Sequence, residues 1–318
     1  MPTRCSPDWR PKAVARLRIG TRGSPLALAQ AHETQRRLAE ALGADAAAFE
    51  IVVIKTSGDM IQDRALSESG GKGLFTKEID AAMLLGRIDI AVHSAKDLPT
   101  HLPEGIVAAG YLAREDVRDA LISARATTFA ELPQGGTLGT ASLRRQAQAK
   151  RLRPDLQVGL LRGNVETRLG KAERGEIDAT LLAYAGLKRL GLAHRATALL
   201  EIEDFLPAVG QGAIGLTARP DDTAALEALA PILDAATGRA LACERAFLAV
   251  LDGSCKTPIA GYAVLEGAVL RFRGAVYRAD GSEAFEVVGS GQPEDGAAIG
   301  AAAGRDLLAR LPKGVLAG

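Results

Sequence analysis

The sequence of 318 residues is poor in aromatic side chains, histidine and cysteine, and it has almost no net charge. Aromatic residues make up 4% of it, so few side chains are present on which the bases of single-stranded nucleic acid could stack. Because 39 basic residues are balanced by 38 acidic ones, neither DNA nor a membrane surface is expected as the main partner. No run approaches the roughly 18 apolar residues of a membrane-spanning helix.

Two further classes are excluded by the cysteines and histidines. Cys5, Cys243 and Cys255 form an odd set in a long chain, which is no disulfide framework and fits a reducing compartment. The four histidines do not cluster with other ligands at metal-binding spacing, so we expect no metal site. Residues 1–17 carry several cations and lack the apolar core of a secretory signal. We therefore predict a flexible N-terminal extension on a cytoplasmic protein.

Two stretches of the chain alternate short β-like runs with helical patterns, which is typical of α/β architecture with largely parallel strand pairing. In the first, Ser24 and Pro25 predict the N-cap and the first residue of a helix that ends near Gly43. In the second, Ser142 predicts the cap of a helix that Pro154 stops. The runs IGTRGS and LGTASL share one pattern at an offset of 119 residues. This favours two similar domains that face each other across a cleft.

The chain changes character after these two stretches. Residues 261–291 alternate apolar and polar side chains around an Asp280-Gly281 turn, which predicts an antiparallel sheet followed by a helix at about 295–311. This pattern indicates a third, small α+β domain. The predicted division is an extension at 1–17, domain 1 at 18–112 and 213–230, domain 2 at 113–212, and domain 3 at 231–318.

Arginine is the dominant cation, with 29 residues against 10 lysines, and its planar fork suits carboxylates and phosphates. The densest stretch runs from Thr140 to Arg168, where seven cations and two acidic residues leave a charge of +5. Arg144 and Arg145 fall in the first turn of the predicted helix, where the helix dipole disfavours cations. That placement indicates an anionic ligand, and the alternative is an ordinary solvated helix face.

Other cations follow predicted strands, at the end where α/β proteins bind their ligands. Arg22 follows the first strand, Arg162 follows a later one, and Ser24 opens a helix start that suits an anion. The glycine-rich run SGGKG lacks the spacing of a phosphate-binding loop, so a nucleotide site is not supported. We predict one cleft with forks for several carboxylates. Its arginines would be Arg22, Arg144, Arg145, Arg162 and Arg168.

Two positions are candidates for chemistry as well as binding. In HSAKDLP, Asp97 stands beside Lys96 at a strand-to-turn junction, where a carboxylate can act as acid or base or stabilise a cationic intermediate. The alternative is that Asp97 only starts the turn before Pro99. Cys255 lies in a polar loop beside Lys256, a cation that favours the thiolate, so it is a candidate nucleophile or covalent attachment point. Cys243 shares an apolar helix face and is predicted to be a core residue.

Taken in order, these motifs resemble those of the hydroxymethylbilane synthase family, also called the porphobilinogen deaminase family. The similarity covers about residues 18–265 and is looser in the last strands and helix. It runs through RIGTRGSPLALAQA, SGGKGLFTKEI, DIAVHSAKDLPT, REDVRDA, LGTASLRRQ, LLRGNVETRL, AGLKRLGL, LPAVGQGAIG and GSCKTPIAGYA.

The resemblance implies a fold, a cofactor and an activity. The fold is two α/β domains like the halves of type II periplasmic binding proteins around a cleft, plus a small C-terminal α+β domain. A dipyrromethane cofactor would be joined to Cys255 by a thioether. Four porphobilinogen molecules would add to it with loss of ammonia, and water would release hydroxymethylbilane. Each unit brings two carboxylates, which suits many arginines. The enzyme would act as a monomer on porphobilinogen, with no nucleic acid, membrane or metal.

The resemblance also implies roles for residues that match the family's motifs. Asp97 corresponds to a catalytic aspartate that helps protonate the leaving amine and stabilises the electron-poor intermediate. Cofactor contacts would come from Lys96, Ser142, Arg144, Arg145 and Arg189. Substrate contacts would come from Arg22, Ser24, Arg162, Arg168 and Gln211. Lys72 and Phe75 would belong to a flap over the site.

The sequence departs from the family pattern at three positions. Ala141 removes one hydroxyl before the paired arginines, Glu68 stands where relatives can carry a lysine, and Ser254 replaces a glycine before the cysteine. From the residues alone, two other classes stay open. A solute-binding protein would also place arginines between two α/β domains, although the export signal is missing and a third domain is present. A nucleic-acid binder ranks third.

Overall fold

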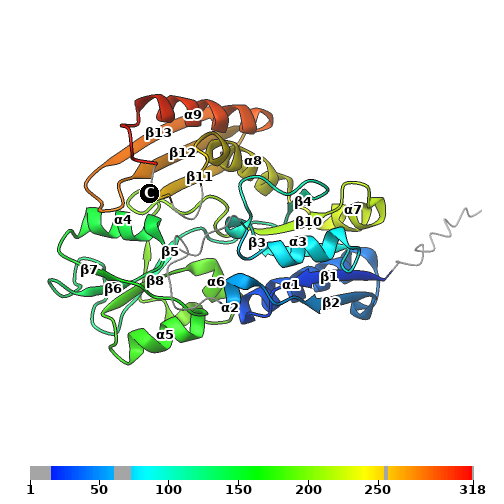
Figure 1. The fold of residues 1–318 in the computed structure, drawn as a ribbon, viewed down its shortest axis with the longest axis horizontal. Helices are drawn as coiled ribbons and strands as arrows, with labels where there is room; N and C mark the ends of the chain where they lie inside the picture. Colours follow the sequence, from blue (N-terminus) through cyan, green and yellow to red (C-terminus); the bar gives the residue numbers. More distant parts are fainter. Residues whose placement is uncertain (1–15, 61–72, 254–256, 317–318) are drawn as a thin grey trace, which may run out of the picture.

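A computed structural model describes residues 16–60, 73–253 and 257–316, and their strands form three sheets (Figure 1). The first sheet has the strand order β2-β1-β3-β10-β4, the second β7-β6-β8-β5-β9, and the third β11-β12-β13. The strands are β1 (Leu17–Thr21), β2 (Phe49–Val53), β3 (Ile90–Ser94), β4 (Val107–Tyr111), β5 (Asp119–Ile122), β6 (Thr137–Gly139), β7 (Gln157–Gly159), β8 (Ala179–Ala183), β9 (Ala198–Leu200), β10 (Ile214–Ala218), β11 (Ile259–Glu266), β12 (Val269–Tyr277) and β13 (Ala284–Gly291).

The two five-stranded sheets have the same topology. In the first, β1 pairs in parallel with β2 and β3, and in the second, β6 pairs in parallel with β7 and β8. The fourth strand of each sheet, β10 or β5, runs antiparallel to both of its neighbours. The prediction of two similar α/β domains is therefore confirmed. The expected largely parallel pairing is wrong, because the fourth strand of each sheet enters from the other domain and runs the opposite way.

The chain crosses between the two sheets twice, once after β4 and once after β9. The two crossing segments lie against each other, because the amide of Glu115 donates to the carbonyl of Gly212 over 3.2 Å. Gly212 has a φ of +88°, and a Cβ there would come within 2.4 Å of the Glu115 oxygen, so the contact requires glycine. The predicted domain boundaries themselves stay a prediction.

The helices begin and end largely where the sequence signals stand. Ser24 accepts the amide of Ala27 at the start of α1, and Gly43 ends it with a φ of +59°. Ser142 accepts the amide of Arg145 at the start of α4, which ends before Pro154. The helices are α1 (Pro25–Leu42), α2 (Ser57–Met60), α3 (Lys77–Leu84), α4 (Leu143–Leu152), α5 (Val165–Glu173), α6 (Tyr184–Arg189), α7 (Thr223–Leu229), α8 (Ala235–Val250) and α9 (Gly296–Arg310). In the described ranges, no helix is long and apolar enough to cross a bilayer.

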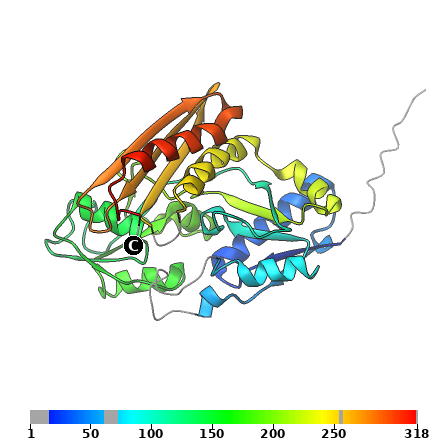
Figure 2. The same cartoon turned by 45° about the horizontal axis from the view of Figure 1, so that its top comes forward.

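The third domain is an antiparallel sheet with α8 and α9 along one face (Figures 1 and 2). Its core includes Phe247 and Phe272, whose ring centroids are 5.0 Å apart. Cys243 is fully buried there, which confirms its prediction as a core residue, and burial raises the pKa of its thiol to about 12. The domain is tied to the first crossing segment by Arg114, whose Nη1 lies 2.6 Å from Oε1 of the buried Glu244 on α8.

Candidate active site

The turn that carries Lys96 and Asp97 lies where β3 leaves the first sheet. Residues Ala95–Asp97 form one turn of 3-10 helix, and the amide of Ala95 donates to the carbonyl of Ala213 over 3.0 Å. Gly210 has a φ of +75°, and a Cβ on it would come within 3.0 Å of the Lys96 nitrogen. The second crossing segment therefore lies directly against this turn and fixes its position.

The carboxylate of Asp97 is half-buried and, among the described residues, accepts no hydrogen bond. Its charge opposes the lowering of the pKa of Lys96 and of Arg168 that burial causes, so it lies near cations of both α/β domains. A carboxylate in such a place can hold or transfer a proton. The structure therefore places Asp97 as a chemically competent group, and its catalytic role stays a prediction.

Lys96, the neighbour of Asp97, has a lowered pKa. Burial and the neighbouring Arg145 lower its pKa to about 8, while Asp97 and Asp119 oppose that shift. Its Nζ donates to Oε1 of Gln211 over 3.4 Å. Burial therefore makes the charged form of Lys96 unfavourable, and a bound anion would stabilise it.

Gln211 connects the turn to the second domain. It is fully buried, and its Nε2 donates to the carbonyl of Val117 over 2.7 Å and to Oδ1 of Asp119 over 3.2 Å. With its Oε1 facing Lys96, the amide spans the two domains through one side chain. The predicted Gln211 position is thus inside the cluster, where its hydrogen bonds join protein groups of both domains.

The paired arginines of α4 share one buried carboxylate, that of Asp119 at the start of β5. Nη2 of Arg144 lies 2.7 Å from Oδ2 of Asp119, and Nη2 of Arg145 lies 2.6 Å from Oδ1. The side chains are 0–7% exposed, so the alternative of a solvated helix face is wrong. Burial would raise the pKa of Asp119, but the two guanidinium groups outweigh it and hold that pKa well below its ordinary value.

Even with Asp119, positive charge remains in excess around α4. Arg144 also donates from Nη1 to the carbonyl of Leu206 over 2.7 Å, yet its buried Nε has no hydrogen-bond partner among the described residues. Burial and the charge of Arg145 lower the pKa of Arg144, and Asp119 only partly offsets this shift. A buried N–H without an acceptor costs free energy, so an additional acceptor at this place would be stabilising.

Arg168 on α5 joins this cationic group from a different element. Burial, Arg145 and Arg162 lower its pKa to about 10, and Asp97 acts in the opposite direction. Its Nε donates to the carbonyl of Gly163 over 2.9 Å, which orients the guanidinium beside the loop before α5. The structure therefore brings together the predicted Lys96, Asp97, Arg144, Arg145, Arg162, Arg168 and Gln211.

Arg22 is held by partners that sequence patterns did not indicate. Its Nε donates to Oδ2 of Asp59 over 3.2 Å, and its guanidinium stacks on the ring of Phe75, 4.1 Å from the centroid. Burial and Arg22 lower the pKa of His93 to about 4, so that imidazole is neutral beside the guanidinium. Arg22 and Phe75 thus form one unit at the end of β1.

The remaining predicted residues occupy structural positions or lie outside the described ranges. The hydroxyls of Ser24 and Ser142 cap α1 and α4. Arg189 donates from Nη2 to the carbonyl of Gly212 over 2.8 Å. Cys255 and Lys72 lie outside the described residues, so nothing is added to their predicted roles.

Two carboxylates of the site escaped the sequence patterns. Asp119 stands in Asp-Ala-Leu-Ile, and a single acid opening an apolar strand was the available signal. Asp59 lies in a four-residue helix in a stretch without periodicity. Asp119 offsets the charge of Arg144 and Arg145, and Asp59 offsets that of Arg22.

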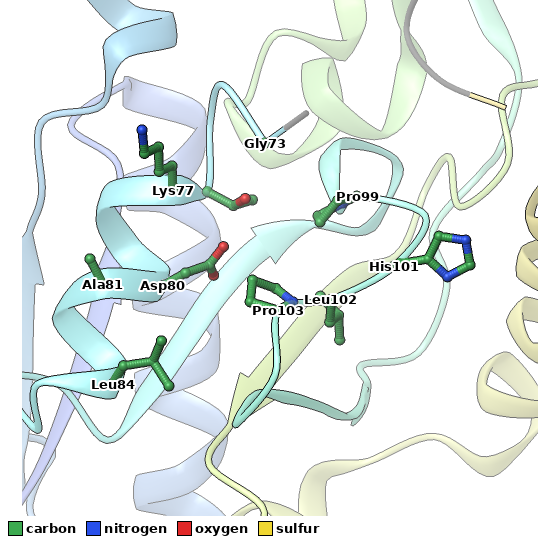
Figure 3. A pocket seen from close by; sticks show the side chains of 10 residues that line it. Gly73, Lys77, Asp80, Ala81, Leu84, Pro99, His101, Leu102 and Pro103 are labelled. Atoms are coloured by element: carbon green, nitrogen blue, oxygen red, sulfur yellow. The ribbon is translucent and has the colours of Figure 1, made fainter. Parts of the chain in front are cut away.

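A cavity of about 350 Å³ lies on another side of the same turn. It is lined by α3 and by the chain after Asp97, and Figure 3 shows the Asp80 carboxyl pointing toward the space beside Pro99 and Pro103. Burial raises the pKa of Asp80. None of the arginines discussed above lines this cavity, so it is separate from the cationic group.

The fold and the site together define a class: a protein of two α/β domains and a small third domain that gathers buried cations around one carboxylate from each α/β domain. Such a site suits a ligand that carries several carboxylates, because arginine forks and an ammonium ion already lie close together there. Within the described ranges, no group of three or more His, Cys, Asp or Glu residues is arranged to hold a metal ion.

Comparison with known sequences identifies the family. Residues 17–227 match the family domain described as "Porphobilinogen deaminase, dipyromethane cofactor binding domain", and residues 239–309 match "Porphobilinogen deaminase, C-terminal domain". A porphobilinogen deaminase of Nitrobacter hamburgensis is 56% identical over 292 residues, which cover 92% of each chain. The chain belongs to the porphobilinogen deaminase family.

Solved structures of similar shape are periplasmic binding proteins. One is an ABC transporter periplasmic substrate-binding protein from Coxiella burnetii, with a TM-score of 0.42 and 14% identity, covering 68% of this chain and 91% of that one. Another is the aliphatic sulphonate binding protein SsuA from Escherichia coli, with a TM-score of 0.41 and 16% identity, covering 74% and 70%.

Proposed function

We propose that the chain is a transferase that condenses four porphobilinogen molecules, releases four molecules of ammonia, and frees hydroxymethylbilane by reaction with one water. Membership of the porphobilinogen deaminase family supports the activity. The observation that carries the assignment of residues is that Lys96 and Asp97 of the first domain lie near cations of the second, Arg145 near Lys96 and Arg168 near Asp97.

The residues present fit a dipyrromethane cofactor. The orphaned Nε of Arg144 and the lowered pKa values of Lys96 and Arg168 all indicate that acceptors are too few for the buried cations. Propionate and acetate groups would supply those acceptors. Lys96, Arg144 and Arg145 would hold the cofactor, and Cys255 would anchor it. When bound, the cofactor supplies the pyrrole carbon onto which new units are joined.

Asp97 is the group that handles the proton and the positive charge. It holds the aminomethyl group of porphobilinogen in its protonated form, from which ammonia departs. It then stabilises the positive charge that develops on the pyrrole nitrogen, because a nearby carboxylate is worth most where water is excluded. Its freedom from hydrogen bonds among the described residues leaves both oxygens available for this.

The cations orient the substrate. Arg168 and Arg162 of the second domain and Arg22 of the first are the candidates for binding the acid side chains of the incoming porphobilinogen. Ser24, Ser142, Arg189 and Gln211 then act mainly by holding these elements in place, as their hydrogen bonds indicate. Lys72 and Phe75 complete the proposed flap.

We also propose that the enzyme acts as a monomer in the cytoplasm, with porphobilinogen as its partner. Light scattering of the purified enzyme at its working concentration tests the first point. A stable dimer would contradict it.

Intact-mass measurement before and after adding porphobilinogen tests the proposed function. The purified protein should exceed its sequence mass by two linked pyrrole units, and the added substrate should produce a ladder of equal increments. Cys255→Ser should carry no excess, whereas Cys243→Ala, the control cysteine, should carry the full excess because that thiol is buried with a raised pKa.

The outcomes separate two failures. An active wild-type protein without the mass excess would overturn the anchoring at Cys255. A protein with neither mass excess nor turnover of porphobilinogen would overturn the proposed activity.

A further inference from the structure

The chain after Asp97 is fastened to the third domain at a specific place. The hydroxyl of Thr100 donates to the carbonyl of Gly253 over 2.6 Å. Gly253 lies three residues after Val250, the last residue of α8, and precedes the segment 254–256 that contains Cys255. One hydrogen bond thus joins the turn of the proposed acid to the last described residue before the proposed attachment point.

A second contact holds the same turn from α8. Nη2 of Arg245 donates to the carbonyl of Pro99 over 2.8 Å and to that of Thr100 over 3.2 Å. These carbonyls flank the residue whose hydroxyl reaches Gly253. The guanidinium therefore orients Thr100 from the opposite side, and charge-assisted bonds of this kind are stronger than neutral ones.

The position of Gly253 leaves no space for a side chain. A Cβ on it would come within 2.4 Å of Leu248 Cδ1 and 2.6 Å of Ile259 Cδ1, and its amide donates to the carbonyl of Leu248 over 3.0 Å. On the far side of the segment, Pro258 accepts the amide of Tyr277 over 3.0 Å. The hydrogen bond of Thr100 therefore joins the turn that carries Asp97 to a closely packed part of the third domain.

We propose that Thr100 is a positioning residue for the reaction, which couples the turn of Asp97 to the chain just after α8 and so holds the proposed acid in place. The inference rests on the proposed function. It assigns Thr100 no contact with substrate. Its effect is on the geometry in which Asp97 meets each incoming unit, where a misplacement of about 1 Å can cost on the order of 100-fold in rate.

The test compares Thr100→Val with Thr100→Ser in the holoenzyme. Valine keeps the shape but removes the hydroxyl, whereas serine keeps the donor. We expect Thr100→Val to assemble the cofactor and to lower kcat for porphobilinogen roughly tenfold or more with KM nearly unchanged. Thr100→Ser should stay within about twofold of wild type. Intact mass reports cofactor loading, and thermal unfolding reports stability.

A kcat of Thr100→Val equal to that of wild type would overturn the proposal, as would an equal loss in both variants. Arg245→Gln gives a second route, since it removes the support of the same turn without altering Thr100. It should lower kcat in the same sense, and unchanged kcat in this variant would also count against the proposal. If the wild-type enzyme itself fails to turn over porphobilinogen, the proposed function is at fault.

Discussion

The two α/β domains share one topology but differ in what they contribute to the site. In the first domain, β3 leads into the turn that carries Lys96 and Asp97. At the corresponding place in the second, β8 leads into the helix Tyr184–Arg189, which carries no acid. The first domain therefore supplies the candidate acid, and the second supplies the paired arginines at the start of α4.

The fourth strand of each sheet shows how this difference is stabilised. The first residue of β10 is Ile214, paired with Ser94, and the first residue of β5 is Asp119, paired with Ala183. An apolar residue in one domain thus corresponds to a buried carboxylate in the other. Because Asp119 neutralises part of their charge, two arginines can lie buried at a helix start, a place that otherwise disfavours them. Asp119 is thus the acidic position that allows the second domain to bury two arginines, although both domains share one topology.

Removing the acid of the first domain should have the largest effect. Asp97→Asn should lower turnover by about 10²–10⁴-fold, the range expected for loss of an acid or base, with little change in thermal stability. The physical reason is that the amide keeps the shape but neither holds the proton nor offsets positive charge. Steady-state kinetics and thermal unfolding check this. Asp45→Asn changes an exposed acid outside the site and should leave the turnover of porphobilinogen unchanged. Equal activity of the Asp97 and Asp45 variants would refute the division of roles between the two domains.

Removing the acid of the second domain should act on stability first. Asp119→Asn should lower the free energy of unfolding by about 3–5 kcal/mol, because two buried guanidinium groups lose their carboxylate. Chemical denaturation measures this. In the matched control, Glu40→Gln breaks the exposed pair with Arg36 and should cost less than about 1 kcal/mol. Equal costs would mean that Asp119 does not explain the burial of the arginines.

The pH dependence of binding should come from the first domain alone. Lys96 is charged below its pKa of about 8 and loses its charge above it, while arginines stay charged throughout. Bound cofactor carboxylates shift this pKa upward, so the gain in thermal stability that cofactor loading brings should shrink at pH values above about 8. Lys96→Arg should flatten the profile. If the profile of that variant keeps the same inflection, another group is responsible.

The smallest effects should come from the two helix caps, which occupy equivalent places. Ser24→Ala and Ser142→Ala should each lower the free energy of unfolding by about 1 kcal/mol, since each leaves one amide without its acceptor. Chemical denaturation measures the stability of both variants, and intact mass measures how much cofactor each of them carries. A loading defect in Ser142→Ala alone would sharpen the comparison, because it would add a cofactor contact to the cap.

Much of the fold and of the site could be predicted from local signals. Ser24, Gly43 and Ser142 marked helix ends because capping is decided by neighbouring residues. The paired arginines stood out because they oppose a helix dipole. By contrast, Asp119 reaches Arg144 across a separation of 25 residues, and the place of β10 depends on a crossing segment rather than on its own pattern. These relations are tertiary, and no short window of sequence contains both partners.

The double crossing has a consequence for how the protein is made. On the ribosome, β4 emerges long before β10, yet β10 is the strand with which it pairs. The second sheet, by contrast, is encoded in one stretch between Asp119 and Leu200. The middle of the chain can therefore finish folding first, while the earlier strands wait with an open edge for Ile214–Ala218. Nascent chains that stop before this segment would expose that edge to aggregation.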